Sequence, residues 1–552
     1  MGNCLAAFRS RPKTHTPHDN FKDYPILPGN RTVICVAGLG TSALWCEKKS
    51  CCGTQKRVRY CSAHLLATDP EQTIESLEMH LVERKQKDGS IVRTVESREG
   101  CIVTPVEGHA GICTLNPGDP AAAGRLGIWD TLISELHPLF NFRSFAYDWR
   151  RWGELQYVDS LVTKFKEQVE EAIKQDQHES KKAALIGHST GASLILYAIS
   201  QLGAEWQQRY LDQVILVAPA HMGAPVMIQS YAQAHPEATV DWLHAQEFFS
   251  KPLGRVCGTW PCVVAALPMS VGKHLPWPDK HVFCHSVYKK YKLADMGKFL
   301  DDLSDCKEDK ELGSELWPDI KKIRAGTHCP FVPTDIIFGN KTDTPNEYTY
   351  RSADLSQAPH AKSHAPGDGV IVADTIEKLV SDWSWEGRTV DCFACPEKVL
   401  HKDIMSHPFT TAFIERFLVH SELVVVYIKV FKAEDLPCAD DVGLSDPYVW
   451  VGIPGTKVSH KSQVIYDDLN PHWNFECVFY TFQLGVDSIA LAVYDYDDED
   501  SAGECIGKAV LSSTRVEDCY EGDLDLIPSG NITVKARAEF LQRRSDRSWW
   551  PL

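Results

Sequence analysis

The residue of this chain best placed for covalent chemistry is a serine in a turn bounded by glycines. Ser189 lies in Gly187-His-Ser-Thr-Gly191, after the apolar run Ala183-Ala-Leu-Ile and before the helical pattern Ala192-Ser-Leu-Ile-Leu-Tyr-Ala. A strand that leads through Gly-x-Ser-x-Gly into a helix is typical of a nucleophile elbow, where the glycines leave room that side chains would block. The pattern predicts that Ser189 is a nucleophile.

A serine hydroxyl attacks an ester only when a base takes its proton and a carboxylate orients that base. In hydrolases built on a parallel sheet the order along the chain is serine, acid, histidine. His401 follows an apolar run and precedes a predicted helix at residues 409–418, so we predict that it is the base, with His407 as the alternative. Two acids compete for the third position, Asp343 after a predicted strand and Asp368 in a Pro-Gly-Asp-Gly turn. The spacing alone leaves both acids open.

Attack on a carbonyl builds negative charge on its oxygen, which preoriented backbone N–H groups stabilise. The expected donors are the N–H of Thr190, next to the nucleophile, and the N–H of Leu39, in the turn Val36-Ala-Gly-Leu-Gly after the first predicted strand. The same base then activates either water or an alcohol against the acyl-enzyme. Residues 45–110 are open to two interpretations, a mobile lid or packed structure.

Acidic residues gather a second time, in the last quarter of the chain. Asp440 and Asp446 lie in one predicted loop, and Asp495 and Asp497 lie in Val493-Tyr-Asp-Tyr-Asp. Calcium takes about six to eight oxygen ligands, so carboxylates from more than one loop must converge to hold it. The alternative is that these acids only keep the loops soluble.

The elements that must position these residues change in character along the chain. Apolar strand-like runs alternate with amphipathic helical stretches, which indicates a parallel sheet covered by helices. The runs begin at Thr32, Ser144, Ala184, Val214 and Asp335. From Leu423 onward, short strands separated by turn residues indicate a β-sandwich. We therefore predict an α/β-hydrolase domain at 31–420 and a smaller all-β domain at 421–542, with an arm at 1–30 and a tail at 543–552.

The first of these domains resembles the lecithin:cholesterol acyltransferase family, which includes lysosomal phospholipase A2 and phospholipid:diacylglycerol acyltransferase. The resemblance rests on five motifs, which are Val36-Ala-Gly-Leu-Gly40, Tyr147-Asp-Trp-Arg150, Gly187-His-Ser-Thr-Gly191, His221-Met-Gly-Ala-Pro225 and Pro366-Gly-Asp-Gly369. It implies that Asp368 is the acid, and that the chain is a serine acyltransferase or phospholipase acting on glycerophospholipid esters. Ala37 and Thr190 depart from the residues that are usual in the family, which are proline and leucine.

The second domain resembles a C2 domain, through the acidic loops and Leu469-Asn-Pro-His-Trp-Asn. The resemblance implies a calcium site made by Asp440, Asp446, Asp495 and Asp497, with Asp500 or Glu504 as the fifth acid. It also implies recruitment to a phospholipid membrane when calcium binds. We expect no cofactor for catalysis itself.

Composition limits the classes of function. The formal net charge of −17 and the lack of a long basic run argue against a nucleic-acid partner. No apolar run approaches the roughly 18 to 20 residues that span a bilayer, and the N-terminus lacks the apolar core of a signal peptide. We therefore expect a protein that is not secreted.

The 19 cysteines are odd in number, which favours free thiols in a reducing compartment. Cys46, Cys51, Cys52 and Cys61 would suit a disulfide staple only in an oxidising one. Cys392-x-x-Cys395 lacks a second pair at zinc spacing, so we interpret these as unligated thiols as well.

The N-terminus resembles that of doubly acylated proteins. In Met1-Gly2-Asn3-Cys4, Gly2 is the expected site of myristate and Cys4 that of palmitate. We therefore expect a peripheral protein on the cytoplasmic face of a membrane, with a lipid acyl donor and an alcohol acceptor as substrates. The alternatives are a catalytically inactive, calcium-dependent membrane scaffold and a secreted lipase stapled by disulfides.

Overall fold

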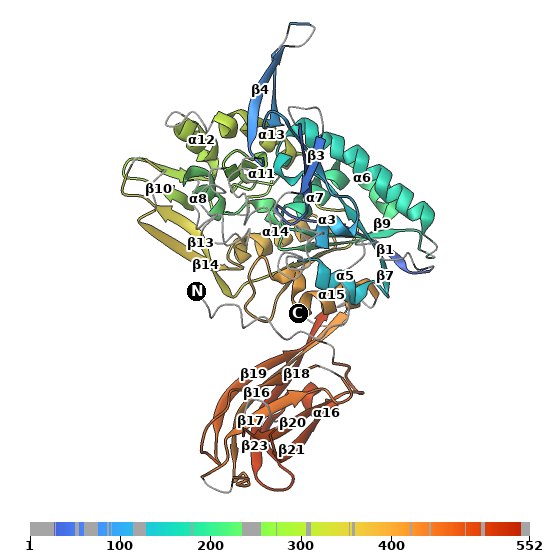
Figure 1. Ribbon diagram of the computed structural model, residues 1–552, viewed down its shortest axis with the longest axis vertical. Helices are drawn as coiled ribbons and strands as arrows, with labels where there is room; N and C mark the ends of the chain where they lie inside the picture. Colours follow the sequence, from blue (N-terminus) through green and yellow to red (C-terminus); the bar gives the residue numbers. More distant parts are fainter. Residues whose placement is uncertain are drawn as a thin grey trace. The chain divides into compact units, whose positions relative to one another are not determined.

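The computed structural model describes residues 27, 29–49, 55–59, 76–85, 88–89, 91–113, 128–176, 178, 180–233, 256–271, 273–275, 277–304, 311–352, 354–355, 359–419, 422–440, 443–456, 458–480, 482–497 and 503–542. The chain divides into two compact units, Met1–His407 and Pro408–Leu552 (Figure 1). The helix at 408–419 thus groups with the second unit, whereas the sequence analysis assigns it to the first domain.

A parallel sheet of six strands forms the centre of the first unit, in the order β15-β12-β9-β8-β1-β7. The strands are β1 (Arg31–Val36), β7 (Phe140–Phe145), β8 (Ala183–His188), β9 (Leu211–Val217), β12 (Thr334–Phe338) and β15 (Val390–Ala394). Every residue of β8 and β12 is buried, which is why both strands read as continuous apolar runs in the sequence. β7 begins four residues before the predicted run Ser144-Phe-Ala-Tyr and ends two residues before the end of that run, so Tyr147 and Asp148 lie in the loop that follows the strand.

Helices accompany this sheet in the order expected of an α/β fold. They are α3 (His109–Cys113), α5 (Asp130–Leu136), α6 (Leu155–Gln175), α7 (Thr190–Tyr210), α8 (Val226–Gln233), α11 (Pro261–Ala265), α12 (Met296–Ser304), α13 (Glu311–Ala325) and α14 (Ala373–Trp385), with short turns η1 (Trp149–Arg151), η2 (Ala220–Met222), η4 (Leu293–Asp295) and η6 (Ile404–Ser406). In α6 the buried residues recur every three or four positions, because only one face of the helix meets the core.

Smaller sheets join the helices of the first unit. One has three strands, β2 (Leu44–Lys49), β3 (Gln55–Arg59) and β6 (Cys101–Pro105), and a hairpin is made by β4 (Met79–Lys85) and β5 (Ile91–Ser97). In Figure 1 this hairpin projects from the helices around it. Another sheet has four strands, β10 (Val282–His285), β11 (Lys290–Lys292), β13 (Thr342–Thr349) and β14 (Ala361–Gly367).

The second unit is a sandwich of two four-stranded antiparallel sheets, with the orders β19-β16-β23-β22 and β18-β17-β20-β21. Its elements are α15 (Pro408–Val419), β16 (Glu422–Glu434), β17 (Pro447–Gly452), β18 (Ser459–Lys461), β19 (His472–Phe479), β20 (Ser488–Asp495), β21 (Cys505–Ser512), α16 (Ser513–Glu517), β22 (Glu521–Asp525) and β23 (Asn531–Gln542). Inward-facing residues of both sheets, such as Val430, Val451 and Leu491, form one apolar core. None of the helices that the structure describes is long and apolar enough to cross a bilayer.

Candidate active site and calcium site

Ser189 occupies a strained turn between β8 and α7. Its backbone angles are φ 55° and ψ −122°, which a residue with a side chain rarely adopts. The surrounding backbone holds this geometry, because the N–H of Ser189 donates to the carbonyl of Val217 at 3.0 Å and its own carbonyl accepts from Ala220 at 3.2 Å. The predicted nucleophile elbow is therefore present in the backbone.

The glycines on both sides of Ser189 are needed because neighbouring atoms already occupy the space that a side chain would take. A Cβ on Gly187 would lie 2.7 Å from the Cα of Ala192, and a Cβ on Gly191 would lie 2.3 Å from the carbonyl oxygen of Val36. Both contacts are with backbone, which cannot move aside as a flexible side chain can. The two glycines of the motif thus have a steric explanation.

The structure brings Ser189, His401 and Asp368 into one line of hydrogen bonds. The Nε2 of His401 lies 2.9 Å from the Oγ of Ser189, and its Nδ1 lies 2.9 Å from the Oδ2 of Asp368. All three residues are buried, with Asp368 only 1% exposed. A serine, an imidazole and a carboxylate in this order make the arrangement that activates a hydroxyl for attack on an ester.

The competition between the two acids is decided by their positions on β13 and β14. Asp368 follows β14, and its Oδ1 accepts the N–H groups of Val370 at 2.9 Å and Ile371 at 2.7 Å. Asp343 lies on β13 between the buried Thr342 and Thr344, so the alternation of the strand leaves its side chain exposed. Of these two acids, Asp368 is the one whose carboxylate contacts His401.

His407, the alternative base, has other partners. Its Nδ1 lies 3.6 Å from the Sγ of Cys395, and its Nε2 lies 3.4 Å from the carboxylate of Glu397. Burial opposes the charged ring, but the hydrogen bonds with Cys395 and Glu397 outweigh it and raise the pKa of His407 to about 9. The interpretation of Cys392 and Cys395 as unligated thiols stays a prediction.

The residues predicted to stabilise the oxyanion lie in two segments next to the nucleophile, the start of α7 and the loop that follows β1. Thr190 is the first residue of α7, where N–H groups have no acceptor within the helix. Leu39 follows Gly38, and a Cβ on Gly38 would lie 2.8 Å from the Cβ of Ser189. A hydrogen bond fixes the loop of Leu39, since the hydroxyl of Tyr147 donates to the carbonyl of Ala37 at 2.8 Å. That both N–H groups bind the oxyanion stays a prediction.

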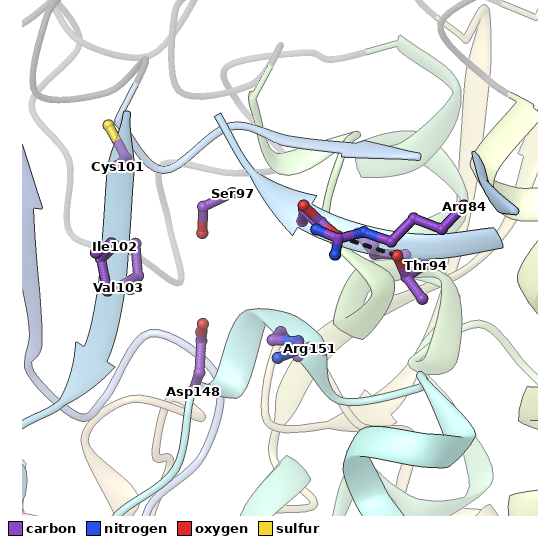
Figure 2. A pocket seen from close by; sticks show the side chains of 10 residues that line it. Arg84, Thr94, Ser97, Cys101, Ile102, Val103, Asp148 and Arg151 are labelled. Atoms are coloured by element: carbon purple, nitrogen blue, oxygen red, sulfur yellow. Dashed lines mark hydrogen bonds and ion pairs between the residues drawn. The ribbon is translucent and has the colours of Figure 1, made fainter. Parts of the chain in front are cut away.

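The Tyr-Asp-Trp-Arg motif forms a buried ion pair. The guanidinium of Arg150 lies 2.7 Å from the carboxylate of Asp148 and also donates to Ser97 of β5 at 3.0 Å. Asp148 and Arg151 line a cavity of about 450 Å³ whose opposite wall is β5 and β6 (Figure 2). The motif therefore fastens the base of the β4–β5 hairpin to the hydrolase core.

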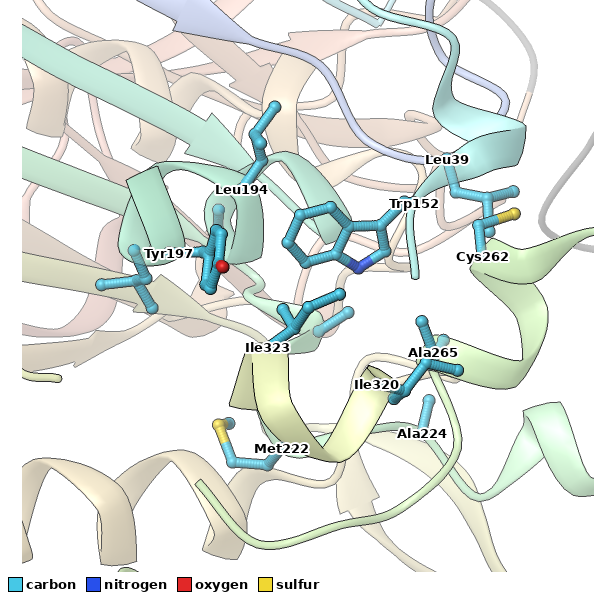
Figure 3. Packing of buried hydrophobic residues seen from close by; sticks show 14 of the residues in the cluster. Leu39, Trp152, Leu194, Tyr197, Met222, Ala224, Cys262, Ala265, Ile320 and Ile323 are labelled. Atoms are coloured by element: carbon cyan, nitrogen blue, oxygen red, sulfur yellow. The ribbon is translucent and has the colours of Figure 1, made fainter. Parts of the chain in front are cut away.

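The tryptophans of this region are core residues. Trp149 is 2% exposed and Trp152 is 1% exposed. Trp152 packs among Leu194, Ile320 and Ile323 in Figure 3, in the apolar cluster that also contains Leu39.

In the second unit three predicted calcium ligands converge. One carboxylate oxygen from each of Asp440, Asp495 and Asp497 lies within 4.8 Å of the others. Asp446 is adjacent, because its N–H donates to Asp495 at 2.6 Å and its own Oδ1 accepts from the N–H of Asp467 at 2.8 Å. Hard oxygen donors gathered from several loops suit calcium.

The charges in this cluster act on one another. Incomplete solvation, together with the negative charges of Asp495, Asp446, Asp497 and Asp467, raises the pKa of Asp440. A bound divalent cation would relieve that repulsion, so the donor set fits the ion.

Glu504, one of the two alternatives predicted for the fifth acid, does not join the cluster of Asp440, Asp495 and Asp497. Glu504 is exposed, and the contact with Asp495 is made by its backbone carbonyl, which accepts at 2.8 Å. Asp500 lies outside the described residues, as do Gly2 and Cys4 at the N-terminus. Asp467, which the sequence analysis did not include, lies close enough to raise the pKa of Asp440.

Comparisons with known proteins agree with this division. Residues 91–364 match the model of the lecithin:cholesterol acyltransferase family, and residues 424–524 match that of the C2 domain. The first unit therefore contains a lecithin:cholesterol acyltransferase domain over residues 91–364. The fold predicted from the sequence, an α/β hydrolase joined to a C2 sandwich, is confirmed.

Individual relatives match one domain each. Phosphatidylcholine-sterol acyltransferase of Gallus gallus is 26% identical over 248 residues, which cover 44% of this chain and 52% of that protein. Phospholipid:diacylglycerol acyltransferase of Saccharomyces cerevisiae is 29% identical over 153 residues, covering 25% of this chain and 22% of that one. Synaptotagmin-5 of Arabidopsis thaliana is 34% identical over 92 residues, which cover 17% of this chain and 16% of that protein.

The chain thus spans about half the length of the acyltransferase from Gallus gallus. The family match includes Ser189 and ends at residue 364, before Asp368 and His401. The positions of Asp368 and His401 beside Ser189 are therefore evidence that does not come from that match.

Proposed function

We propose that this protein is a serine-dependent acyltransferase or phospholipase that acts on glycerophospholipid esters at a membrane surface. The observation that carries the proposal is the line of hydrogen bonds from the Ser189 hydroxyl through His401 to Asp368 at a strained strand-to-helix turn. The names of the relatives, a phosphatidylcholine-sterol acyltransferase and a phospholipid:diacylglycerol acyltransferase, support a lipid ester as the donor.

The reaction follows from the geometry in two halves. His401 Nε2 takes the proton of Ser189 as its Oγ bonds to the ester carbonyl, and the negative charge formed on the oxygen is stabilised by the N–H groups of Leu39 and Thr190. Collapse breaks the bond to the leaving alkoxide, which receives the proton from His401. Asp368 keeps its charge throughout and stabilises the imidazolium between these steps.

The acyl group on Ser189 is then passed to an acceptor. His401 removes the proton of an alcohol or of water, whose oxygen bonds to the acyl carbon, and the second collapse returns the proton to Ser189. With an alcohol the product is a new ester, and with water it is a free fatty acid. The two activities differ only in the acceptor that reaches the acyl-enzyme.

The C2 domain would bring this site to its substrate. Asp440, Asp495 and Asp497 would hold calcium, which supplies positive charge for anionic lipid headgroups. Leu444 and Tyr466, in the loops beside these acids, are 42% and 67% exposed, which suits contact with a bilayer. We further propose that acylation at Gly2 and Cys4 keeps the protein on the cytoplasmic face, because one weak lipid anchor needs a second signal.

The test is acyl release and transfer from labelled phospholipid vesicles that contain an acceptor alcohol, with and without calcium. Wild type should yield product and Ser189→Ala should yield none, and the ratio of new ester to free acid would define the activity. If wild type binds vesicles only with calcium but forms no product from any phospholipid or neutral ester, the protein is instead a membrane scaffold.

A further inference from the structure

The residue before the nucleophile, His188, contacts the backbone of the base. It is the last residue of β8 and 1% exposed. Its Nε2 lies 3.2 Å from the carbonyl oxygen of His401, and the two imidazole rings have centroids 5.0 Å apart with planes inclined by 37°. The contact joins positions 213 residues apart in the sequence.

The chemistry of this contact determines where His188 carries its proton. A carbonyl oxygen only accepts hydrogen bonds, so Nε2 must be the protonated nitrogen. The other nitrogen, Nδ1, has no hydrogen-bond partner among the described residues. Burial, followed by the nearby charge of His401, lowers the pKa of His188 well below that of an ordinary histidine. His188 is thus a neutral ring with a single N–H, and that N–H points at His401.

The contact completes the fixation of His401. Its backbone N–H donates to the carbonyl of Asp368 at 2.8 Å, and its two ring nitrogens face Asp368 and Ser189. The backbone carbonyl is the remaining polar group, and His188 donates to it. His401 is 8% exposed, so water has little access to replace that donor.

We propose that His188 is a positioning residue that holds the general base His401 by a hydrogen bond to its backbone carbonyl. This inference rests on the proposed serine mechanism and adds to it a residue that touches neither the ester nor the reacting proton. A neutral donor suits the position, because a second positive charge would oppose the imidazolium that His401 becomes during the reaction. Misplacing a catalytic group by about 1 Å costs on the order of 100-fold in rate, so a contact that only positions can matter this much.

The experiment compares His188→Leu with His188→Gln. Leucine fills similar space without a donor, whereas the side-chain N–H of glutamine is the same number of bonds from Cβ as Nε2 of histidine. With a soluble short-chain ester we expect His188→Leu to lower kcat about 10- to 100-fold with KM within about threefold, and His188→Gln to recover most of that loss. A residue needed only for folding would not show this split.

The rate of reaction with a fluorophosphonate probe tests the proposed serine mechanism and the positioning role of His188 separately. Here the Oγ of Ser189 bonds to phosphorus, fluoride leaves, and His401 passes the proton to solvent, so the probe reports an activated serine without any lipid substrate. Absence of labelling in wild type would refute the proposed function. Labelling of wild type with a slower rate in His188→Leu and a restored rate in His188→Gln supports the positioning role.

His281→Leu is the matched control, because the Nε2 of His281 also lies against a backbone carbonyl, that of Asn346 at 2.9 Å. Its kcat should stay within about twofold of wild type. Equal kcat in folded His188→Leu, or equal impairment of His188→Leu and His188→Gln, would overturn the proposal. If His188→Leu does not fold, His188→Asn replaces it: its N–H is one bond too short, so it should be impaired where His188→Gln is not, and equal activity of the two would contradict the role.

Discussion

The Nδ1 of His401 lies 2.9 Å from the Oδ2 of Asp368, while Asp343, the other acid in the correct chain order, has its side chain exposed on β13. Asp368 also accepts two backbone N–H groups on its other oxygen, so the orientation of its carboxylate is fixed. The contact with His401 therefore assigns the role of the acid to Asp368, whereas sequence spacing alone allowed either Asp368 or Asp343.

Asp368→Asn should lower kcat by roughly 10³- to 10⁴-fold, because the amide cannot stabilise the imidazolium and favours the wrong tautomer of His401. Asp343→Asn is the matched control, and its kcat should stay within about twofold of that of wild type. The measurement is turnover of a soluble ester together with thermal melting. A larger loss from Asp343→Asn than from Asp368→Asn would contradict the assignment.

Gly38→Ala should lower kcat by at least about 100-fold, since the new Cβ would lie 2.8 Å from the Cβ of Ser189 and must displace the nucleophile or the loop of Leu39. In the control Gly326→Ala, the nearest atom to the new Cβ is the amide nitrogen at the end of the flexible Gln201 side chain, at 3.1 Å, so activity should hardly change. Steady-state kinetics and fluorophosphonate labelling check both variants. Normal labelling of Gly38→Ala would show that the close contact is not needed.

Calcium should raise the melting temperature of the protein, because binding to Asp440, Asp495 and Asp497 removes the repulsion among them. At calcium a hundredfold above its Kd the free energy of unfolding should rise by roughly 3 kcal/mol. Asp497→Asn should weaken this effect and the binding to anionic vesicles, whereas Asp525→Asn, an exposed aspartate on β22, should not. Differential scanning calorimetry with calcium or chelator is the measurement, and identical melting in both would argue for a calcium-independent C2 domain.

Calcium affinity should also fall as the pH is lowered. The pKa of Asp440 is raised, so protons compete for this ligand at a pH higher than for an ordinary aspartate. Titration calorimetry at several pH values measures this. Affinity that does not change with pH until ordinary aspartates protonate would contradict it.

His407 should stabilise the fold in a way that depends on pH. Its pKa is raised to about 9, above the roughly 6.5 of an unfolded histidine. The stabilisation is therefore complete below about pH 6.5 and lost as the pH rises through 9. Because the site is partly open to solvent, which screens the charges, we expect about 1 kcal/mol or less.

The measurement compares the melting temperatures of wild type and His407→Gln across this range. The two should differ most near pH 6 and converge near pH 10. A difference that is constant with pH would mean that the charge of His407 contributes nothing.

Much of the fold was predictable because the relevant patterns are local. β1, β8, β9 and β12 are buried apolar runs, and the glycines around Ser189 mark a turn that side chains would block. β7 was harder to predict, because Asn141 and Arg143 interrupt its apolar residues, and the strand begins four residues before the predicted run.

The parts of the site that sequence analysis missed depend on contacts between distant segments. No sequence pattern around Asp467 predicts that it lies near Asp440. The two are brought together because the N–H of Asp467 donates to the side chain of Asp446, which lies in the same loop as Asp440. Tyr147 was identified as part of a motif, but its bond to the carbonyl of Ala37 crosses 110 positions.

By itself, the sequence determined the nucleophile turn, the candidate base, the two classes of domain and the candidate calcium ligands. These follow from residue types and short spacings, since strand alternation, glycine turns and clustered carboxylates are properties of neighbouring residues. Only the tertiary structure decided that Asp368 rather than Asp343 meets His401, and that His188 lies against the backbone of the base. The reason is that a hydrogen bond requires atoms within about 3 Å of each other. For residues up to 213 positions apart, that distance is set by how the strands and loops pack.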